Sequence, residues 1–322
     1  MMILAGDIGG TKCNLGVFEV REGALLPLRR ERLSSQSFPS AEEAFRTFLQ
    51  AGREKITAAA LAIAGPVLRN RVQVTNLPWL VDAVALSKAF GIPHVRLLND
   101  LEGTAYALGI LPASDFVTLR EGVDDPEGNQ ALLAAGTGLG EALLIRDGNR
   151  LVISATEGGH CDFAPRNDRE IDLLCFLKER LGIVAIEAIL SGRGFRELHT
   201  FLNAGVSHPG FDDPQIDAAP EITHNALAGT CPVCVEAVRL WVEVYGSEAG
   251  NLALKAMARG GVFIAGGIAV KILPLLQDGR FIEAFNRKEK MEALLSRIPL
   301  RVVTNEEAPL WGAAYVASHE VL

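Results

Sequence analysis

A shortage of cysteine and of positive charge removes two classes of protein. The five cysteines are odd in number and scattered along the chain, which argues against a disulfide framework and predicts reduced thiols. Acidic residues number 39 and basic residues 31, and the resulting net charge of −8 argues against a nucleic-acid-binding protein. We therefore expect neither a small disulfide-stapled scaffold nor a basic protein that binds a nucleic acid.

Long apolar runs are also missing. No run reaches the roughly 18 residues that a membrane-spanning helix needs. Thr57 to Val67 comes nearest, but Gly65-Pro66 interrupts it. The first residues, Met1 to Asp7, carry no basic segment ahead of an apolar one, so no targeting sequence is expected. We therefore expect no membrane partner and a cytoplasmic location.

What remains is the composition of an ordinary globular protein, 49% hydrophobic and 22% charged. At 322 residues a single core is not expected, and two domains are the default. Residues 121–130 are polar and rich in turn formers, which predicts that the chain passes into a second domain just before them.

Strands and helices are predicted to alternate, which indicates an α/β fold with largely parallel central strands. The predicted strands are 3–8, 13–20, 25–33, 58–64, 95–98, 132–135, 139–145, 261–265 and 300–304. The predicted helices are 41–51, 81–90, 101–108, 169–181, 191–202, 231–257, 268–276 and 308–319. Residues 203–220, with three prolines, are predicted to form a loop.

One pattern occurs twice. A strand, a Gly-Thr turn, a second strand and an Arg-acid-Gly turn end first at Arg21-Glu22-Gly23 and again at Arg146-Asp147-Gly148. This repetition predicts two halves of related structure.

The first Gly-Thr turn, Asp7-Ile8-Gly9-Gly10-Thr11, has the residues of a phosphate-binding loop. Glycines allow a close approach of backbone N–H groups to phosphate, and the Thr11 hydroxyl can donate a further hydrogen bond. Asp7 can hold Mg²⁺ directly or through water. The alternative is a simple hairpin turn.

The second turn, Gly136-Thr137-Gly138-Leu139-Gly140, superficially resembles a dinucleotide-binding fingerprint. It lacks the third glycine at the right spacing and the helix that must follow, and it has no Gly-Lys-Ser/Thr of a P-loop. A hairpin phosphate loop fits better. Gly266-Gly267, between a predicted strand and helix, permits close approach of a ribose or adenine, or is a tight turn. Together these loops predict nucleotide binding.

Asn99-Asp100 follows a predicted strand and lies in the sequence between the two Gly-Thr turns. A carboxylate placed at a strand end in a nucleotide-binding protein suits a general base. We therefore predict phosphoryl transfer with Asp100 as the base.

Glu157-Gly158-Gly159-His160-Cys161-Asp162 is an unusually polar segment. Glu157 and His160 could converge on a ligand with several hydroxyls, such as a sugar. The alternatives are a polar surface turn and a metal site of His160, Cys161 and Asp162, whose spacing is poor for a metal. Glu187, alone among apolar residues, fits the solvated face of a helix by itself.

Cys231-Pro232-Val233-Cys234 is a CxxC sequence. The thioredoxin-like context of a redox motif is absent. A zinc site would need further ligands, and the spacing from His208 and His224 matches no standard site. We interpret the pair as two thiols in the first turn of a helix.

Taken together, the motifs resemble those of the bacterial ATP-dependent glucokinases nearly end to end. The resemblance implies an α/β, two-domain sugar-kinase/actin-like ATPase (ribonuclease H-like) fold with an interdomain active-site cleft. It also implies a small domain of 1–110 plus 305–322 and a large domain of 111–304. The matching segments, in the same order, are Gly6–Thr11, Thr75–Trp79, Asn99-Asp100, Ala135–Gly140, Glu157–Pro165, Leu190–Gly194 and Gly261–Ile268.

The resemblance also implies site residues. Glucose would be bound by Asn99, Asp100, Glu157, His160 and Glu187, with Asp100 as the base. ATP, with Mg²⁺ as cofactor held by Asp7 through water, would be bound by Asp7, Gly9, Gly10, Thr11, Lys12, Gly136, Thr137, Gly138, Gly266 and Gly267. The family is usually cytoplasmic and homodimeric.

Some residues depart from the family pattern. Lys12 stands where Asn is frequent, and Arg193-Gly194 where Pro-Gly is commoner. The Cys-rich zinc motif of the related repressor/kinase group is not found, which favours the plain glucokinase branch. The sequence thus predicts transfer of the γ-phosphoryl of MgATP to the 6-hydroxyl of glucose. Alternatives are a kinase for another hexose and a non-catalytic, sugar-responsive regulator.

Overall fold

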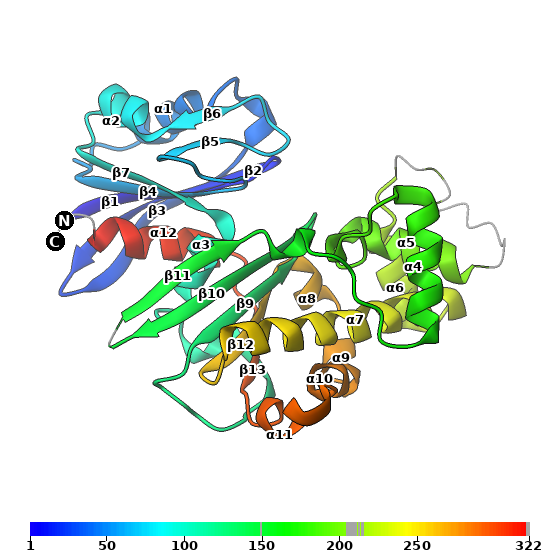
Figure 1. Ribbon diagram of the computed structural model, residues 1–322. Helices are drawn as coiled ribbons and strands as arrows, with labels where there is room; N and C mark the ends of the chain where they lie inside the picture. Colours follow the sequence, from blue (N-terminus) through cyan, green and yellow to red (C-terminus); the bar gives the residue numbers. More distant parts are fainter. Residues whose placement is uncertain (149, 204–210, 212, 214–215, 320–322) are drawn as a thin grey trace. The chain divides into compact units, whose positions relative to one another are not determined.

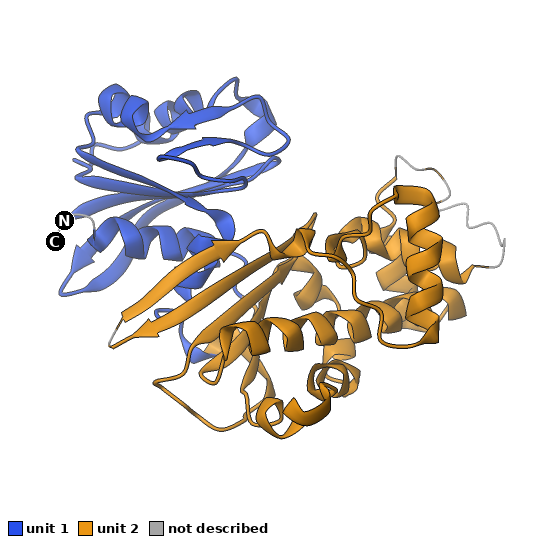
Figure 2. Cartoon of the chain, viewed as in Figure 1, with its two compact units in different colours: residues 1–113, 305–322 blue, residues 114–304 orange. Residues whose placement is uncertain are grey.

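The computed structural model describes residues 1–319 except 149, 204–210, 212, 214 and 215. The chain forms two compact units, Met1–Ala113 with Asn305–Leu322 and Ser114–Thr304 (Figure 2). The predicted domains divide the chain close to these points, and the independent folding of each stays a prediction. Among the described residues, no helix has both the length and the apolar character needed to cross a bilayer.

The sheet of unit 1 has the order β3-β2-β1-β4-β7 (Figure 1). Its strands are β1 (Met2–Ile8), β2 (Lys12–Arg21), β3 (Ala24–Ser34), β4 (Ala58–Ile63) and β7 (His94–Asn99). The first three pair as antiparallel hairpins, whereas β1, β4 and β7 run parallel to one another. A separate two-stranded ribbon consists of β5 (Arg71–Gln73) and β6 (Leu80–Asp82).

Alternate residues of the central strands face two different cores, as the period of two in a strand requires. Leu4 of β1 and Leu61 of β4 pack with α1 (Ala41–Gln50) and α2 (Ala83–Phe90). Ala58, Ala60 and Ala62 point the other way, toward α12 (Ala308–His319). Since these side chains are small, α12 and α3 (Asp100–Ala107) can lie close to that face of the sheet (Figure 1).

Unit 2 repeats this topology. Its sheet has the order β11-β10-β9-β12-β13-β8, in which β9 pairs antiparallel with β10 and parallel with β12, like β1 with β2 and β4. The repetition predicted from the two Gly-Thr turns is thus confirmed at the level of strand order and direction. The strands are β8 (Phe116–Arg120), β9 (Gln130–Ala135), β10 (Leu139–Asp147), β11 (Arg150–Thr156), β12 (Gly261–Ala265) and β13 (Leu300–Val303).

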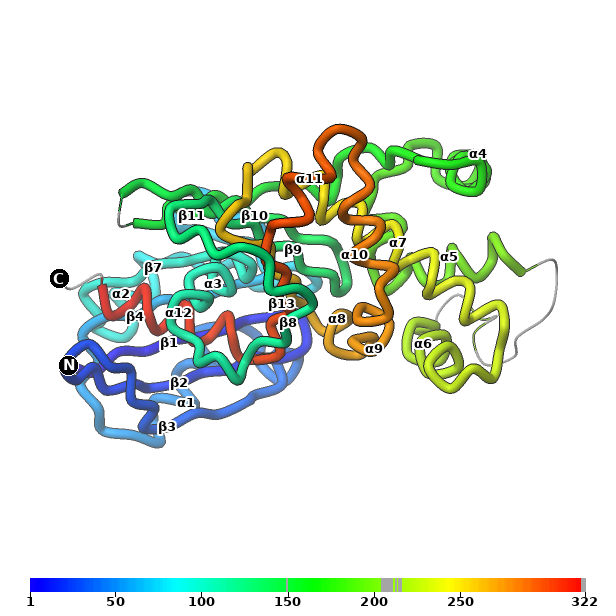
Figure 3. Tube along the Cα trace, turned by 90° about the horizontal axis from the view of Figure 1, so that it is seen from below, coloured from blue at the N-terminus to red at the C-terminus, as the bar shows by residue number. Residues whose placement is uncertain are grey.

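The core of unit 2 surrounds one long helix, α7 (Pro232–Ala256), whose Trp241 and Tyr245 are fully buried. The other helices are α4 (Asp168–Leu181), α5 (Gly192–Leu202), α6 (Ala219–Ala228), α8 (Gly267–Lys271), α9 (Leu273–Leu276), α10 (Arg280–Asn286) and α11 (Glu292–Leu295). Figure 3 shows α5 and α6 beside the first part of α7.

Several predicted boundaries are wrong for local reasons. The helix expected over 81–90 begins only at Ala83, because Val81 pairs in β6 and the Asp82 carboxylate caps the helix at the Val84 N–H (2.8 Å). The helix expected over 268–276 is broken at Ile272, just before Pro274, which has no N–H to continue the helical ladder. Most of the loop predicted at 203–220 lies outside the described residues, and its last two residues already belong to α6.

The close packing of α12 on α3 can be tested at Gly312. A Cβ at this position would overlap the carbonyl oxygen of Gly103. We predict that Gly312→Ala lowers the free energy of unfolding by about 1–3 kcal/mol, the usual cost of overpacking, although alanine favours helix. Gly109→Ala is the control, because a Cβ there has no heavy atom within 4 Å. Denaturant unfolding followed by circular dichroism measures both, and equal midpoints would contradict the close packing.

Candidate active site

The parallel strands of unit 1 end level with one another. Ile8 at the end of β1 pairs with Ile63 of β4, and Ile63 pairs with Asn99 of β7. The Gly9-Gly10-Thr11 turn and Asp100 therefore leave the sheet at the same edge. This carboxyl edge is where open α/β sheets bind ligands.

Asn99 and Asp100 form the junction of β7 and α3. The Asn99 Oδ1 accepts the Leu101 N–H (2.9 Å) and caps α3, while its Nδ2 donates to the Gly65 carbonyl (3.1 Å). Asp100 is the first residue of the helix and is partly exposed. The positive end of the helix dipole favours a negative charge at this position. The structure thus gives Asn99 a role in fixing the junction, and its role as a sugar ligand stays a prediction.

Asp7 lies one residue before the end of β1 and is held from the side. The Asn14 Nδ2 donates to Asp7 Oδ2 (2.8 Å), and Arg32 Nε donates to Asn14 Oδ1 (2.9 Å). Burial raises the pKa of Asp7 to about 6; the Asn14 hydrogen bond opposes the rise, and the negative charge of Asp100 adds to it. A half-buried carboxyl facing a second carboxylate suits a divalent cation, whose charge would favour the ionised form of both.

The loop after β1 is fixed by one backbone and one side-chain hydrogen bond. Gly9 N–H donates to the Lys12 carbonyl (2.8 Å), and Ser35 Oγ donates to the Gly9 carbonyl (2.8 Å). Thr11 and Lys12 are exposed, so their side chains are available to a ligand. The hairpin expected as the alternative is present, and phosphate binding by it stays a prediction.

In unit 2 the corresponding loop follows β9. Gly136 N–H donates to the Gly138 carbonyl (2.8 Å), and the Gly192 N–H at the start of α5 donates to the Gly136 carbonyl (2.9 Å). Gly266 follows β12, the parallel neighbour of β9, and packs on the Ala135 carbonyl with a φ of 89° that suits glycine. The loops predicted to hold a nucleotide, 136–138 and 266–267, therefore leave adjacent strands.

Glu187 is not on the solvated face of a helix, as the surrounding residues alone suggested. It lies in a short turn, Ile186–Ala188, and its Oε2 accepts the Leu139 N–H (3.0 Å). Its Oε1 accepts from Arg193 (3.1 Å). Since the carboxylate lies directly over Gly138, a Cβ at Gly138 would collide with it. Glu187 thus holds the loop after β9.

The turn that bears Glu157 and His160 meets the same loop. Gly159 packs on the Leu139 carbonyl, and the Cys161 carbonyl accepts the Ile186 N–H (2.8 Å), next to Glu187. Glu157 and His160 are both exposed. The structure therefore brings the predicted sugar-binding residues of unit 2 to one place, around the Leu139 backbone. The alternative metal site of His160, Cys161 and Asp162 does not form, because among the described residues the single group of three ligand atoms within 4.8 Å lies elsewhere.

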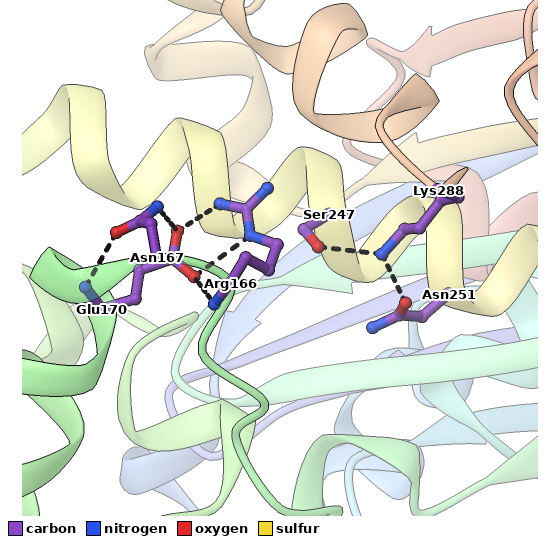
Figure 4. Close-up of polar contacts among 6 residues, drawn as sticks. All are labelled: Arg166, Asn167, Glu170, Ser247, Asn251 and Lys288. Carbon is purple, nitrogen blue, oxygen red and sulfur yellow. Dashed lines mark hydrogen bonds and ion pairs between the residues drawn. The ribbon is translucent and has the colours of Figure 1, made fainter.

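A buried ion pair fixes the chain just after this turn. The carboxylate of Glu170, fully buried, accepts from the side chain of Arg166, from the Arg166 N–H (2.8 Å) and from Asn167 Nδ2 (3.1 Å) (Figure 4). Asn167 Oδ1 in turn accepts the Glu170 N–H (3.0 Å) and caps α4. A buried charge is tolerated when it is bonded in this way. The sequence analysis missed this support for the turn.

Glu141, on β10, is a second residue that the sequence analysis missed. Its side chain lies under Gly158, is 1% exposed, and has one oxygen, Oε1, with no hydrogen-bond partner among the described residues. Burial raises the pKa of Glu141 to about 7; nearby Glu248 of α7 adds to the rise, and Lys255 opposes it. The available signal was one acid within the apolar strand 139–145.

The two related sheets and the loops at their carboxyl edges define a sugar kinase. The family model for glucokinase matches residues 4–320, so the chain belongs to the glucokinase family. The chain is 36% identical to the glucokinase of a Nostoc species and 37% identical to that of a Synechocystis species; each alignment covers 98% of this chain and 97–99% of the relative.

Solved structures agree. A glucokinase from an Antarctic psychrotroph superposes with a TM-score of 0.87 at 31% identity, covering 98% of each chain. The glucokinase of Balamuthia mandrillaris, solved with glucose, has a TM-score of 0.80 at 25% identity, covering 98% of this chain and 93% of that one. A ROK-family glucokinase from Streptomyces griseus, solved with glucose and AMPPNP, shares the fold at 20% identity with a TM-score of 0.66, covering 99% of each chain.

The environment of Glu141 gives a prediction for stability against pH. Because folding raises its pKa from 4.5 to about 7, the stability from the protonated form is complete below about pH 4.5 and is lost as the pH rises through about 7. Glutamine has no charge to bury. The free energy of unfolding of wild type should therefore fall with pH in this range, whereas that of Glu141→Gln should not. We predict that the difference between the two proteins changes by about 2 kcal/mol in favour of Glu141→Gln from about pH 5 to pH 8.

Thermal unfolding across this pH range measures the effect. Glu179→Gln, an exposed residue of α4, is the control and should follow the wild type at every pH. If the melting temperature of Glu141→Gln differs from that of wild type by the same amount at every pH, the Glu141 carboxyl does not titrate in this range.

Proposed function

We propose that this protein is a glucokinase that transfers the γ-phosphoryl of MgATP to the 6-hydroxyl of glucose, giving glucose 6-phosphate and ADP. The observation that carries the proposal is Asp100, a partly exposed carboxylate at the edge of unit 1 that also bears the Gly9-Gly10-Thr11 turn and Asp7. Membership of the glucokinase family, with relatives solved bound to glucose, supports the choice of sugar.

In this proposal Asp100 accepts the proton of the sugar 6-hydroxyl as transfer proceeds. The Asp100 Oδ1 accepts the Leu101 N–H (2.9 Å), and this bond restrains the carboxylate at the start of α3. Glu157, His160 and Glu187, with Asn99, bind the remaining hydroxyls, for which acceptors and donors are both needed. Glu187 keeps a fixed orientation because Leu139 N–H and Arg193 hold its two oxygens.

The nucleotide is bound by backbone N–H groups of the loops after β1 and β9, with the Thr11 hydroxyl and Lys12 charge added in unit 1. Gly266 and Gly267 leave space for the adenosine. Bound Mg²⁺ neutralises charge on the phosphates, and Asp7 has the carboxylate to hold it through water. A homodimer and a cytoplasmic location, which the family resemblance implies, also stay predictions.

The proposal is tested by a coupled ADP-release assay over a panel of hexoses, with ATP, ADP and polyphosphate as donors and with Mg²⁺ added or chelated. We expect release that requires Mg²⁺ and ATP and whose kcat/KM is highest for glucose. A higher kcat/KM for mannose, fructose or N-acetylmannosamine would instead identify a kinase for that sugar. Sugar binding without any turnover would identify a regulator.

The role of Asp100 gives a sharper prediction. Asp100→Asn keeps the shape and the helix start but removes the base, so kcat should fall by about 10²–10⁴-fold while glucose binding is largely kept. Asp168→Asn is a matched control, since Asp168 is also the first residue of a helix, follows an Asn cap and is exposed. Steady-state kinetics and glucose titration by calorimetry separate the two quantities. Near-normal turnover in the Asp100→Asn protein would remove Asp100 as the base.

A further inference from the structure

Three side chains of metal-ligand type meet in unit 2, and none of them is among the residues assigned to glucose and ATP. They are His199 on α5 and Cys231 and Cys234 at the start of α7. Their ligand atoms all lie within 4.8 Å of one another, and no other such group occurs in the described part of the chain. The sequence predicted two thiols in the first turn of a helix, which is confirmed, but spacing did not show that His199 joins them. His224 is exposed on α6 outside the group, and His208 lies outside the described residues.

The separation is close to that of a zinc site. With Zn–S bonds of about 2.3 Å and Zn–N bonds of about 2.0–2.1 Å, tetrahedral ligand atoms lie roughly 3.5–3.8 Å apart. Small rotations of the side chains would therefore bring the three atoms from 4.8 Å or less to metal distance. One nitrogen and two sulfurs form a donor set that suits Zn²⁺ and does not suit Mg²⁺ or Ca²⁺.

The helical frame also suits a metal. Cys231 is the N-cap of α7, and its Sγ accepts the Cys234 N–H (3.5 Å). Pro232, at the first helical position, stiffens this turn. The helix N-terminus favours the negative charge of a thiolate, but burial, with Cys231 beside it, raises the pKa of Cys234 to about 12, so that a bound metal would have to displace the thiol proton. On the other side, the His199 ring packs edge-to-face on Phe211, with centroids 4.7 Å apart.

The exposure of the three side chains indicates where a fourth ligand could bind. Cys234 and His199 are buried, whereas Cys231 is partly exposed. A metal bound by all three would reach solvent on the Cys231 side, where a water molecule can supply the fourth ligand.

We propose that His199, Cys231 and Cys234 bind one Zn²⁺ ion. The ion fastens the last part of α5 to the first turn of α7, two helices that lie side by side (Figures 1 and 3). The other end of α5 bears Gly192, bonded to the Gly136 carbonyl, and Arg193, paired with Glu187. The metal thus steadies the helix whose first turn contacts the loop after β9.

The test measures metal, so its result does not depend on the proposed kinase activity. Protein purified without chelator is expected to contain about one zinc per chain by mass spectrometry. After zinc is removed, Co²⁺ should produce the sulfur-to-cobalt charge-transfer band of thiolate ligands. Cys234→Ser and His199→Gln should each weaken Co²⁺ binding by more than about 100-fold, since each removes a direct ligand. Cys175→Ser and His224→Gln, both at exposed positions, are the controls and should bind as wild type.

A thermal measurement guards against variants that fold poorly. Added Zn²⁺ should raise the melting temperature of metal-free wild type, because an ion that binds only the folded state stabilises it. The same addition should leave Cys231→Ser, altered at the partly exposed ligand, nearly unchanged.

Three outcomes would overturn the proposal. They are a folded wild type with neither zinc nor the cobalt band, a full band in Cys234→Ser, and a Cys231–Cys234 disulfide formed in air in protein that binds no metal. The last would instead indicate a redox pair, seen as a fall from five titratable thiols to three.

Discussion

The parallel register of the central strands is the constraint on which both halves of the molecule depend. In unit 1 it aligns Ile8, Ile63 and Asn99, so that residues distant in the sequence reach one edge of the sheet. In unit 2 it aligns Ala134 with Ala265 and so places the loops after β9 and β12 together. The residues predicted to bind substrate are therefore positioned by the hydrogen-bonded strands of the sheets. These strands are much stiffer than the loops that carry the residues.

Two glutamates of unit 2, Glu187 and Glu141, each pack against a glycine but have different surroundings. Glu187 over Gly138 has a donor for each oxygen, whereas Glu141 under Gly158 is sealed from water and, among the described residues, has one oxygen without a hydrogen-bond partner. The same residue type in one unit thus supplies an acceptor held by two donors at one place and, at another, a carboxyl whose pKa burial raises to about 7. Environment rather than residue identity makes the difference.

The sequence allowed most of the elements to be predicted, because alternation and helical spacing follow directly from which face is buried. It also allowed Asp100 and the Gly-Thr turns to be singled out, since each lies at a strand end. It did not allow Glu187, Glu141 or His199 to be placed by their own neighbours. Their roles depend on contacts with residues far along the chain, such as Leu139, Gly158 and Cys234. Glu187 was assigned only through the family resemblance, which carries such long-range information implicitly.

Helix α7 lies next to two of these residues, because Cys234 in its first turn is close to His199 and its Glu248 interacts with Glu141. Ser247 and Asn251 accept hydrogen bonds from Lys288 (Figure 4), and Glu248, paired with Lys255, faces Glu141. Buried charges of this kind rarely stabilise a fold, and hydrophobic residues of equal volume would often do better. Glu141 in particular is opposed by burial and lies beneath the turn that bears Glu157 and His160. A group that costs stability at this position is the pattern expected of a functional site rather than of a core. The polar face of α7 is therefore best understood as a support of the turn that bears Glu157 and His160, the predicted sugar ligands.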